Sequence, residues 1–244
     1  MLRKLSTLIV CLVATITTAC VQTPPYNEIW YTTTDGRTIS FNDDDLVSNS
    51  YNNGRGVLKF RDRVTTTGIG DYAFSGCSSL TSITIPNSVT SIEDEVFRYC
   101  SSLPVIDNIR YADTYLVETV DKSLTTYSIK AGTRFIGSRA FRGCSSLTSI
   151  TIPDSVTYIG EMAFAGCSSL KSITIPESVT HIEKYAFSGC DSLTSITCLA
   201  TTPPAIGNLR IGKTIMIYVP EEAVKAYKQD PRWYIYEKQI KPIK

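Results

Sequence analysis

A unit of 23 residues recurs along most of the chain, and this repetition constrains the fold more than any other feature of the sequence. Its clearest marker is a phenylalanine, because Phe74 and Phe97 are 23 residues apart and so are successive members of the group Phe141, Phe164 and Phe187. A cysteine follows each phenylalanine by three positions. Most units continue with Ser-Leu and then alternate hydroxyl and aliphatic residues, as in CSSLTSITIP at 77–86 and 144–153. A chain that repeats itself this closely is expected to repeat its structure as well.

The alternating part of each unit has a period of two, which is typical of a half-buried β-strand with isoleucines inward and hydroxyls outward. Pro86 would end the strand at 82–85. The next segment, such as 155–164, places Val156 and Ile159 inward and turns tightly, or by one helical turn, near Gly160. One unit cannot bury its apolar face alone, but stacked units can. The sequence therefore predicts a single right-handed solenoid with about seven parallel rungs, from 57–60 to 195–198, in a sheet about 30 Å long.

The unit resembles the leucine-rich repeats of BspA-like bacterial surface proteins, through the pattern Ala-Phe-x-x-Cys-x-x-Leu at 73–80, 140–147, 163–170 and 186–193. The segments 27–41, 54–60 and 217–233 are similar to the opening and closing segments of that family. The resemblance implies a leucine-rich-repeat solenoid with a cap at each end. It also implies a non-catalytic binding protein at the cell surface, which recognises host, matrix or cell-surface molecules.

The repeat sets the expected domain organisation. Residues 27–56 would form an N-terminal β cap, in which Ile29–Thr33 and Arg37–Phe41 pair as a hairpin around Asp35-Gly36. Residues 57–200 would form the solenoid, interrupted at 103–128 by a hairpin near 105–121 that projects from the array. Residues 201–244 would form a C-terminal cap, with a short helix from Glu221 to Gln229 and Trp233 over the last coil.

The first 19 residues have the pattern of an export signal: basic Arg3 and Lys4, then an apolar stretch, then small residues. The following Cys20 makes the junction resemble a bacterial lipobox, although Thr17 departs from its usual aliphatic residue. Ordinary cleavage after Ala19 is the alternative. An acylated Cys20 would hold the protein at the outer membrane through its lipid chains, with residues 20–26 as a tether and the solenoid exposed at the cell surface.

Composition and missing motifs exclude several classes of function. Lys and Arg total 24 against 23 Asp and Glu, so no global field attracts a nucleic acid. The single histidine, His181, cannot form a histidine-based metal cluster. The triplet Asp43-Asp44-Asp45 lacks the spacing of a calcium loop and favours a solvated turn. Because GxSxG, HExxH and a phosphate-binding glycine loop are missing, we expect that the protein is not an enzyme and needs no cofactor or metal. We also expect a monomer.

Hydroxyl residues are abundant, with 26 Ser and 30 Thr, and the strand pattern directs many of them outward. Such a surface is flat, uncharged and rich in hydrogen-bonding groups, which suits a host or matrix protein or a glycan. Threonine also simply favours a solvated strand face, which is the alternative explanation. The candidate ligand face comprises Ser82, Thr84, Thr126, Ser128, Ser149, Thr151, Ser172, Thr174, Ser195 and Thr197.

Departures from the repeat are the better candidates for specificity, because a uniform face has no sharp pocket. Aromatic and acidic residues in the hairpin and the front cap could contact a ligand, although a capping aromatic is equally often part of a core. These candidate projections are Trp30, Tyr31, Asp107, Tyr111, Asp113 and Tyr115.

The cysteines of successive units form a row that could suggest disulfides or a metal site. Stacked side chains point in parallel, however, and a tetrahedral site needs ligands that converge. The pattern therefore favours a ladder of small buried groups without redox function. Its members are Cys77, Cys100, Cys144, Cys167 and Cys190, with Cys198 as a further core residue.

Overall fold

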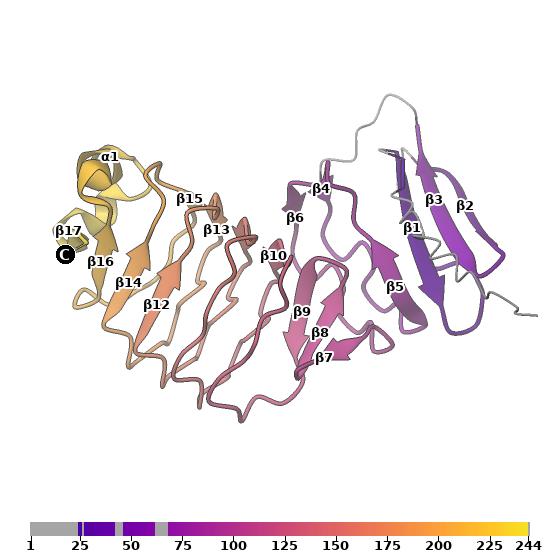
Figure 1. The fold of residues 1–244 in the computed structure, drawn as a ribbon, viewed down its shortest axis with the longest axis horizontal. Helices are drawn as coiled ribbons and strands as arrows, with labels where there is room; N and C mark the ends of the chain where they lie inside the picture. Colours follow the sequence, from indigo (N-terminus) through magenta and orange to yellow (C-terminus); the bar gives the residue numbers. More distant parts are fainter. Residues whose placement is uncertain (1–23, 26, 42–45, 62–67, 244) are drawn as a thin grey trace, which may run out of the picture.

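The computed structural model describes residues 24–25, 27–41, 46–61 and 68–243. The expected export signal, the lipid-anchor candidate Cys20 and the triplet Asp43-Asp44-Asp45 lie outside the described residues. The described chain forms a parallel β-solenoid of about eight turns with a spacing of roughly 23 residues (Figure 1). This confirms the predicted fold class.

The alternating strands pair in parallel and in register toward the C-terminal end. The sheet has the order β12 (Ser172–Ile175), β14 (Ser195–Cys198), β16 (Met216–Val219) and β17 (Ile240–Pro242). Ser172 lies opposite Ser195, and Thr174 lies opposite Thr197. Partners in the first pair of strands are therefore 23 positions apart, which is the period of the sequence, whereas Ser195 and Met216 in the next pair are 21 positions apart.

A second sheet runs along the solenoid, which the sequence did not indicate. Its parallel rungs are two residues long: β10 (Phe135–Ile136), β11 (Tyr158–Ile159), β13 (His181–Ile182) and β15 (Ala205–Ile206). β4 (Gly68–Ile69) and β6 (Ser91–Ile92) pair in the same way nearer the N-terminus. These rungs occupy the segments for which we expected only a turn.

Close approach of neighbouring coils explains the glycine that follows some of these rungs. The Gly160 amide donates to the Ile136 carbonyl at 2.8 Å. A Cβ atom added at Gly160 would lie 2.6 Å from the backbone nitrogen of Ser138. Only glycine fits here, because any side chain would collide with the backbone of the adjacent coil. This close approach, rather than the turn that we expected, explains the glycine.

The expected projecting hairpin is instead a mostly buried wall between two hydrophobic clusters, in which Val105, Ile106 and the turn at 107–108 remain exposed. β7 (Val105–Ile106), β8 (Ile109–Ala112) and β9 (Tyr115–Thr119) are antiparallel, and β9 continues the second sheet by pairing in parallel with β10. Tyr115 and Val117 pack in the N-terminal cluster, while Leu116 packs in the C-terminal one. Because successive side chains of a strand point to opposite faces, β9 serves both cores at once.

The N-terminal cap differs from the expected hairpin. β1 (Glu28–Thr33) pairs antiparallel with β3 (Arg55–Phe60) on one side and β5 (Leu80–Thr84) on the other, and β2 (Leu46–Asn52) adds to β3. Both edges of β1 are therefore occupied, so it does not pair with residues 37–41. Residues 57–60 are likewise antiparallel and do not form the first parallel rung. The cap covers the edge of β5, which would otherwise be open to pairing with another chain.

The C-terminal cap closes the other end with helical turns. They are η1 (Glu221–Ala223), α1 (Val224–Gln229) and η2 (Tyr234–Gln239), so the helical segment begins at Glu221 and reaches Gln229 as predicted. Trp233 is buried and its indole nitrogen donates to the Pro204 carbonyl at 2.8 Å. No helix in the described ranges is long and apolar enough to cross a membrane.

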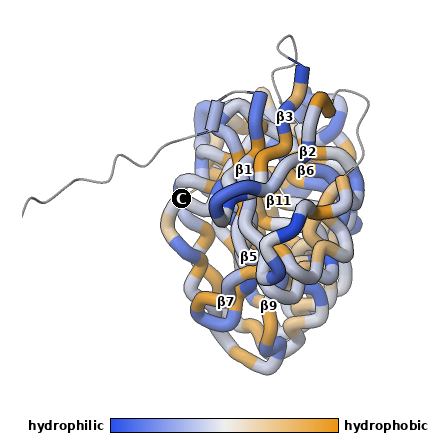
Figure 2. The backbone as a smooth tube through the Cα atoms, turned by 90° about the vertical axis from the view of Figure 1, so that its right-hand side faces the viewer, coloured by the Kyte–Doolittle hydropathy of each residue, from blue (hydrophilic) through white to orange (hydrophobic). Residues whose placement is uncertain are grey.

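Phenylalanine rings form the centre of the stack. Phe164 lies between Phe141 and Phe187, with ring centroids 5.1 and 5.7 Å away and nearly parallel planes. Phe74 and Phe97 repeat this geometry at 5.3 Å before the insertion. Figure 2 shows that hydrophobic and hydrophilic stretches alternate along the chain, as expected when every coil contributes a few residues to a shared core.

The thiols of the cysteine row are buried beside these rings, and the described cysteines are free. A thiol donates to the carbonyl of a phenylalanine in the preceding coil in three units: Cys100 to Phe74 (3.0 Å), Cys167 to Phe141 (3.3 Å) and Cys190 to Phe164 (3.2 Å). Burial raises the pKa of Cys100 and Cys198 to about 12 and that of Cys190 to about 11. These groups are therefore neutral at physiological pH.

Phe164→Ala should lower the free energy of unfolding by about 3–5 kcal/mol, because it leaves a cavity between two stacked rings. Tyr234→Ala is the control: this aromatic residue is 61 % exposed, and its loss should change the free energy by no more than about 0.5 kcal/mol. Equilibrium unfolding in urea measures both. Equal effects of the two substitutions would contradict the stacked core.

The thiols should resist a thiol reagent in the folded protein at pH 8, because burial blocks access to them and also raises the pKa of Cys100 and Cys190. Unfolding in denaturant without reductant should release the six buried thiols, Cys77, Cys100, Cys144, Cys167, Cys190 and Cys198. The difference between native and denatured titrations measures this number. A difference well short of six would indicate disulfides or accessible thiols and refute the buried ladder.

Candidate functional site

The ten hydroxyl residues of the candidate face are all exposed or half-buried. Their inward neighbours, such as Ile83, Ile173 and Ile196, are buried. Alternation along each strand thus places hydroxyls in solvent, as the sequence indicated. Accessibility is a requirement for binding, and whether these residues bind a ligand is a separate question.

The structure divides the hydroxyl face into two parts. Ser172, Thr174, Ser195 and Thr197 are stacked in regular parallel strands. The residues at 126, 128, 149 and 151 lie on extended segments of the preceding coils, where the Thr148 amide donates to the Thr125 carbonyl at 2.9 Å. Ser82 and Thr84 belong to the N-terminal antiparallel sheet. The expected single ladder is therefore interrupted, because the insertion lies between 84 and 126.

An aromatic residue flanks each part of the hydroxyl face. Trp30 lies opposite Thr84 in the cap sheet, and its ring is covered by the Arg55 guanidinium at 4.1 Å. Tyr218 lies opposite Thr197 at the other end. Both aromatic residues are half-buried, so part of each side chain is accessible beside the hydroxyls.

Three of the candidate projections are wrong, because Tyr31, Tyr111 and Tyr115 are core residues. The Tyr31 hydroxyl donates to Asn49 Oδ1 at 2.6 Å, and the Tyr111 hydroxyl accepts from the Lys130 amide at 2.9 Å. Their rings are amphipathic, so the sequence alone did not distinguish an exposed ring from a buried one whose hydroxyl is satisfied.

The acidic candidates have different environments. Asp113 is half-buried, and its carboxylate accepts from the Ile85 amide at 2.8 Å. It therefore fastens the insertion to the end of β5, which is a structural role. Asp107 is exposed at the β7–β8 turn, where it has a φ of 49° and Asn108 has a φ of 64°. Of the six candidates, Asp107 and Trp30 retain access to a partner.

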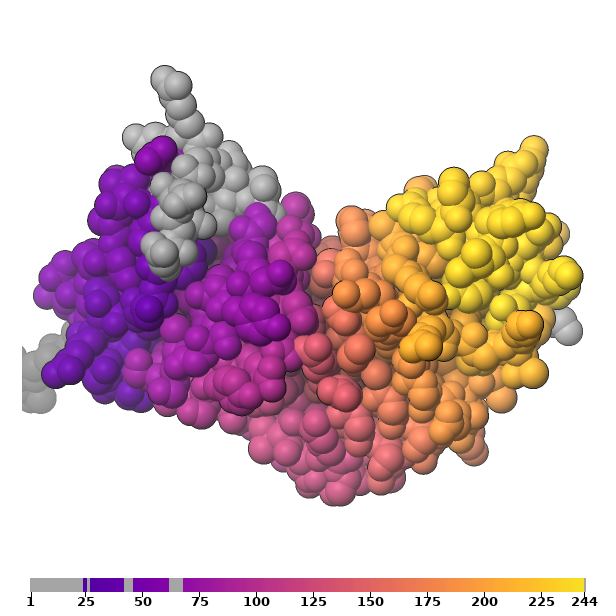
Figure 3. All heavy atoms as spheres, turned by 180° about the vertical axis from the view of Figure 1, so that it is seen from behind, coloured from indigo at the N-terminus to yellow at the C-terminus, as the bar shows by residue number. Residues whose placement is uncertain are grey.

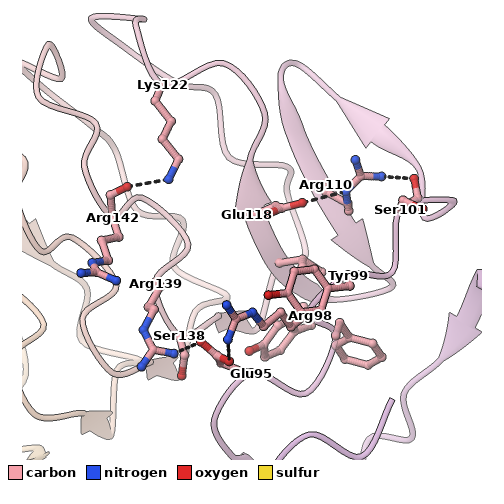
Figure 4. A pocket seen from close by; sticks show the side chains of 13 residues that line it. Glu95, Arg98, Tyr99, Ser101, Arg110, Glu118, Lys122, Ser138, Arg139 and Arg142 are labelled. Carbon is pink, nitrogen blue, oxygen red and sulfur yellow. Dashed lines mark hydrogen bonds and ion pairs between the residues drawn. The ribbon is translucent and has the colours of Figure 1, made fainter. Parts of the chain in front are cut away.

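A cavity beside the insertion was missed by the sequence reasoning. Its volume is about 440 Å³, and five cationic side chains contribute to its lining (Figure 4). They are Arg98, Arg110, Lys122, Arg139 and Arg142. The sequence feature that could have indicated this cavity is the irregular 44-residue interval between Phe97 and Phe141. Basic residues lie within this interval and on both sides of it.

Acidic residues gather in a separate hollow. Figure 3 shows the surface indented between the coils before the insertion and those after it. A cavity of about 350 Å³ spans residues of both parts and is lined by Asp71, Glu93, Asp94, Glu161 and Glu183, with Lys184 beside them. Burial, together with Asp71 and Glu183, raises the pKa of Glu93. Charge is therefore segregated locally although the net charge is only +1.

The described residues offer surfaces for binding. Within the ranges that the structure covers, no group of three or more His, Cys, Asp or Glu side chains is arranged to hold a metal ion. His181 is exposed, and its Nδ1 lies 2.9 Å from the hydroxyl oxygen of its neighbour Thr180.

Solved structures similar to this chain are bacterial leucine-rich-repeat proteins. A leucine-rich repeat protein from Bacteroides ovatus has 30 % identity and a TM-score of 0.34, with 73 % of this chain and 40 % of that chain covered. One from Eubacterium ventriosum has 25 % identity and a TM-score of 0.40, with coverage of 73 % and 52 %. A leucine rich cell surface protein from Faecalibacterium prausnitzii has 26 % identity and a TM-score of 0.34, with coverage of 76 % and 58 %.

The chain spans 40–58 % of the length of these three structures. No curated protein matches it. Six copies of the BspA type leucine rich repeat region match residues 48–117 and 118–208, which is more than half of the sequence. This match agrees with the period, the phenylalanine stack and the parallel rungs described above. The chain therefore belongs to the BspA-type leucine-rich-repeat family.

Proposed function

We propose that this chain is a non-catalytic binding module of the cell surface that recognises a host or matrix protein through its hydroxyl face. The observation that carries the proposal is the in-register stacking of outward-facing hydroxyls, in which exposed Ser172 and Thr174 lie beside half-buried Ser195 and Thr197. Leucine-rich-repeat proteins commonly bind other proteins, and the family assignment supports this class of function.

The chemistry of the face suits recognition through many modest contacts. Each hydroxyl can donate one hydrogen bond and accept others, so the face is compatible with backbone and side-chain groups of a partner. A typical hydrogen bond contributes about 0.5–1.5 kcal/mol net, so affinity requires several rungs at once. Rungs about 4.8 Å apart on a stacked core hold these groups in place before binding, which lowers the entropy cost of association.

A location at the cell surface is the second part of the proposal. The similar protein from Faecalibacterium prausnitzii is described as a cell surface protein. Acylation of Cys20 would supply an anchor in the outer membrane, and the residues up to 26 would act as a tether. With multiple acyl chains, each buried methylene adds about 0.8 kcal/mol, which suffices for stable anchoring.

A glycan is the second candidate ligand, in which case the chain would be an accessory lipoprotein of polysaccharide uptake. The aromatic residues at the ends of the face favour it, because the accessible parts of Tyr218 and of Trp30, whose ring is covered on one side by Arg55, could contact sugar rings beside the hydroxyls. The partner class therefore has to be decided by experiment.

The protein-binding proposal predicts that the purified chain retains a matrix or host-cell protein at micromolar concentration. Ser172→Arg/Thr174→Arg should weaken that binding at least tenfold, because two long cations would disrupt an uncharged contact surface. The control is Thr201→Arg/Thr202→Arg, which adds the same charge at two exposed threonines in the loop after β14. Surface plasmon resonance measures the affinities, and circular dichroism checks the fold.

Two outcomes would contradict this proposal. If no protein binds but a defined polysaccharide on an array does, the glycan candidate replaces it. If a protein binds equally well to the wild type and the Ser172→Arg/Thr174→Arg variant, the hydroxyl face is not the contact surface.

The anchoring proposal predicts that a clickable fatty acid supplied to bacterial cells labels the wild-type chain. Cys20→Ala should abolish the labelling, because it removes the thiol that would be acylated, whereas Cys198→Ala should keep it. Gel fluorescence after enrichment measures the label. Labelling of Cys20→Ala at the wild-type level would refute lipid attachment at this cysteine.

A further inference from the structure

The cavity beside the insertion carries an unbalanced positive charge. Five cationic side chains line it against the two carboxylates of Glu95 and Glu118, and Asp94 pairs with Arg139 at 3.4 Å from outside the lining, which leaves a net charge of +2. The whole chain has a net charge of only +1, so this concentration is local. A cavity of about 440 Å³ lies in the usual size range for small-ligand sites.

Three of the cations are already neutralised and form fixed walls. Arg98 and Arg139 both pair with Glu95. The Arg110 Nε lies 3.1 Å from Glu118 Oε1, and its Nη1 donates to the carbonyls of Ser101 and Leu103 at 2.5 and 2.8 Å. Figure 4 shows these pairs around the cavity. These ion pairs hold the side chains of the cavity wall in place. Their positive charges are already compensated, so they would attract an anionic ligand only weakly.

The other two cations have no carboxylate partner. Lys122 Nζ donates to the Arg142 carbonyl at 2.8 Å, and within the described ranges neither side chain forms an ion pair. Both side chains are exposed and line the same cavity. Figure 4 shows the Arg142 guanidinium pointing away from Lys122, so an anionic group in the cavity would draw this exposed side chain toward it. The anion would then gain charge-assisted hydrogen bonds, which are stronger than neutral ones.

Tyr99 supplies the cavity with an aromatic group and departs from the repeat to do so. Its φ is 63°, in the left-handed region, whereas the sister units have glycine at this position. Those glycines are Gly76, Gly143, Gly166 and Gly189. Positive φ at a bulky residue is common in these units, as at Tyr72, Met162 and Tyr185, so what distinguishes this position is an aromatic ring in place of the glycine. The side chain is 67 % exposed, with the Arg98 guanidinium 4.6 Å from the ring centre.

We propose that this cavity binds a saccharide that carries a carboxylate or sulfate group. Lys122 and Arg142 would bind the anion, the Tyr99 ring would contact the sugar ring, and Ser101 and Ser138 would bind its hydroxyls. An acidic peptide is less suitable, because a peptide needs an extended basic track, whereas Lys122 and Arg142 line one compact cavity. The site uses other residues than the hydroxyl face, so it does not depend on the protein-binding proposal.

Calorimetric titration of the full chain tests the site with four probes: trigalacturonate, a sulfated chondroitin disaccharide, neutral maltotriose and hexaglutamate. We expect at least one acidic saccharide to bind and maltotriose not to bind. Raising the salt concentration should weaken the binding, because the anion contacts are solvent-accessible. The first two probes distinguish a carboxylate ligand from a sulfate ligand.

Substitutions locate the binding. Lys122→Gln/Arg142→Gln should weaken it at least tenfold, and Tyr99→Gly, which restores the residue of the sister units, should weaken it severalfold in a folded protein. Arg37→Gln/Lys213→Gln removes the same charge at exposed positions elsewhere and should leave the affinity unchanged.

Three results would overturn the proposal. They are no binding of either acidic saccharide at millimolar concentration, equal losses in the Lys122→Gln/Arg142→Gln and control variants, and hexaglutamate binding as tightly as the saccharides. None of these results bears on the hydroxyl face, because Lys122, Arg142 and Tyr99 are not part of it.

Discussion

The stacking of one coil on the next is the constraint on which the structure depends, with partners 23 residues apart in the regular units and 20, 21 or 24 residues apart at three other pairs of strands. It acts through the side chains and the backbone together. Phe164 packs between Phe141 and Phe187, while its amide donates to the Ala186 carbonyl at 2.8 Å. A coil of different length would have to lose one of these contacts or compensate for it. Because each coil buries its apolar side only against its neighbours, stability accumulates along the stack.

The same constraint separates the two binding surfaces that we propose. Regular coils give a uniform face, since equal spacing places the same hydroxyl on successive rungs. The irregular interval between Phe97 and Phe141 interrupts that face and is accommodated by β9, whose Leu116 and Val117 face opposite clusters. Basic residues from both sides of this interval then meet in one cavity. The regular coils thus suit an extended partner that contacts several rungs. The cavity at the insertion suits a compact ligand.

Local patterns predicted the solenoid, the inward isoleucines and the buried thiols, because an alternation of period two is visible within one unit. The two-residue rung at Tyr158–Ile159 is too short to show any alternation, so the second sheet was missed. The partners of β1 come from residues 55–60 and 80–84, and pairing over such distances has no local signature. The basic cavity was missed for the same reason, because Arg98 and Arg142 meet only after the insertion has folded.

Removal of one whole unit tests the stacking constraint most directly. Deleting residues 145–167 joins Cys144 to Ser168 and keeps the CSSL sequence intact, so Phe141 should stack on Phe187. We expect this chain to unfold cooperatively in urea, at a somewhat lower midpoint than the full chain. A chain from which only residues 145–156 are deleted should lose the cooperative transition, because the remaining half unit is too short to close a coil between its neighbours. Equal midpoints for the two deletions, or loss of the transition in both, would contradict the account.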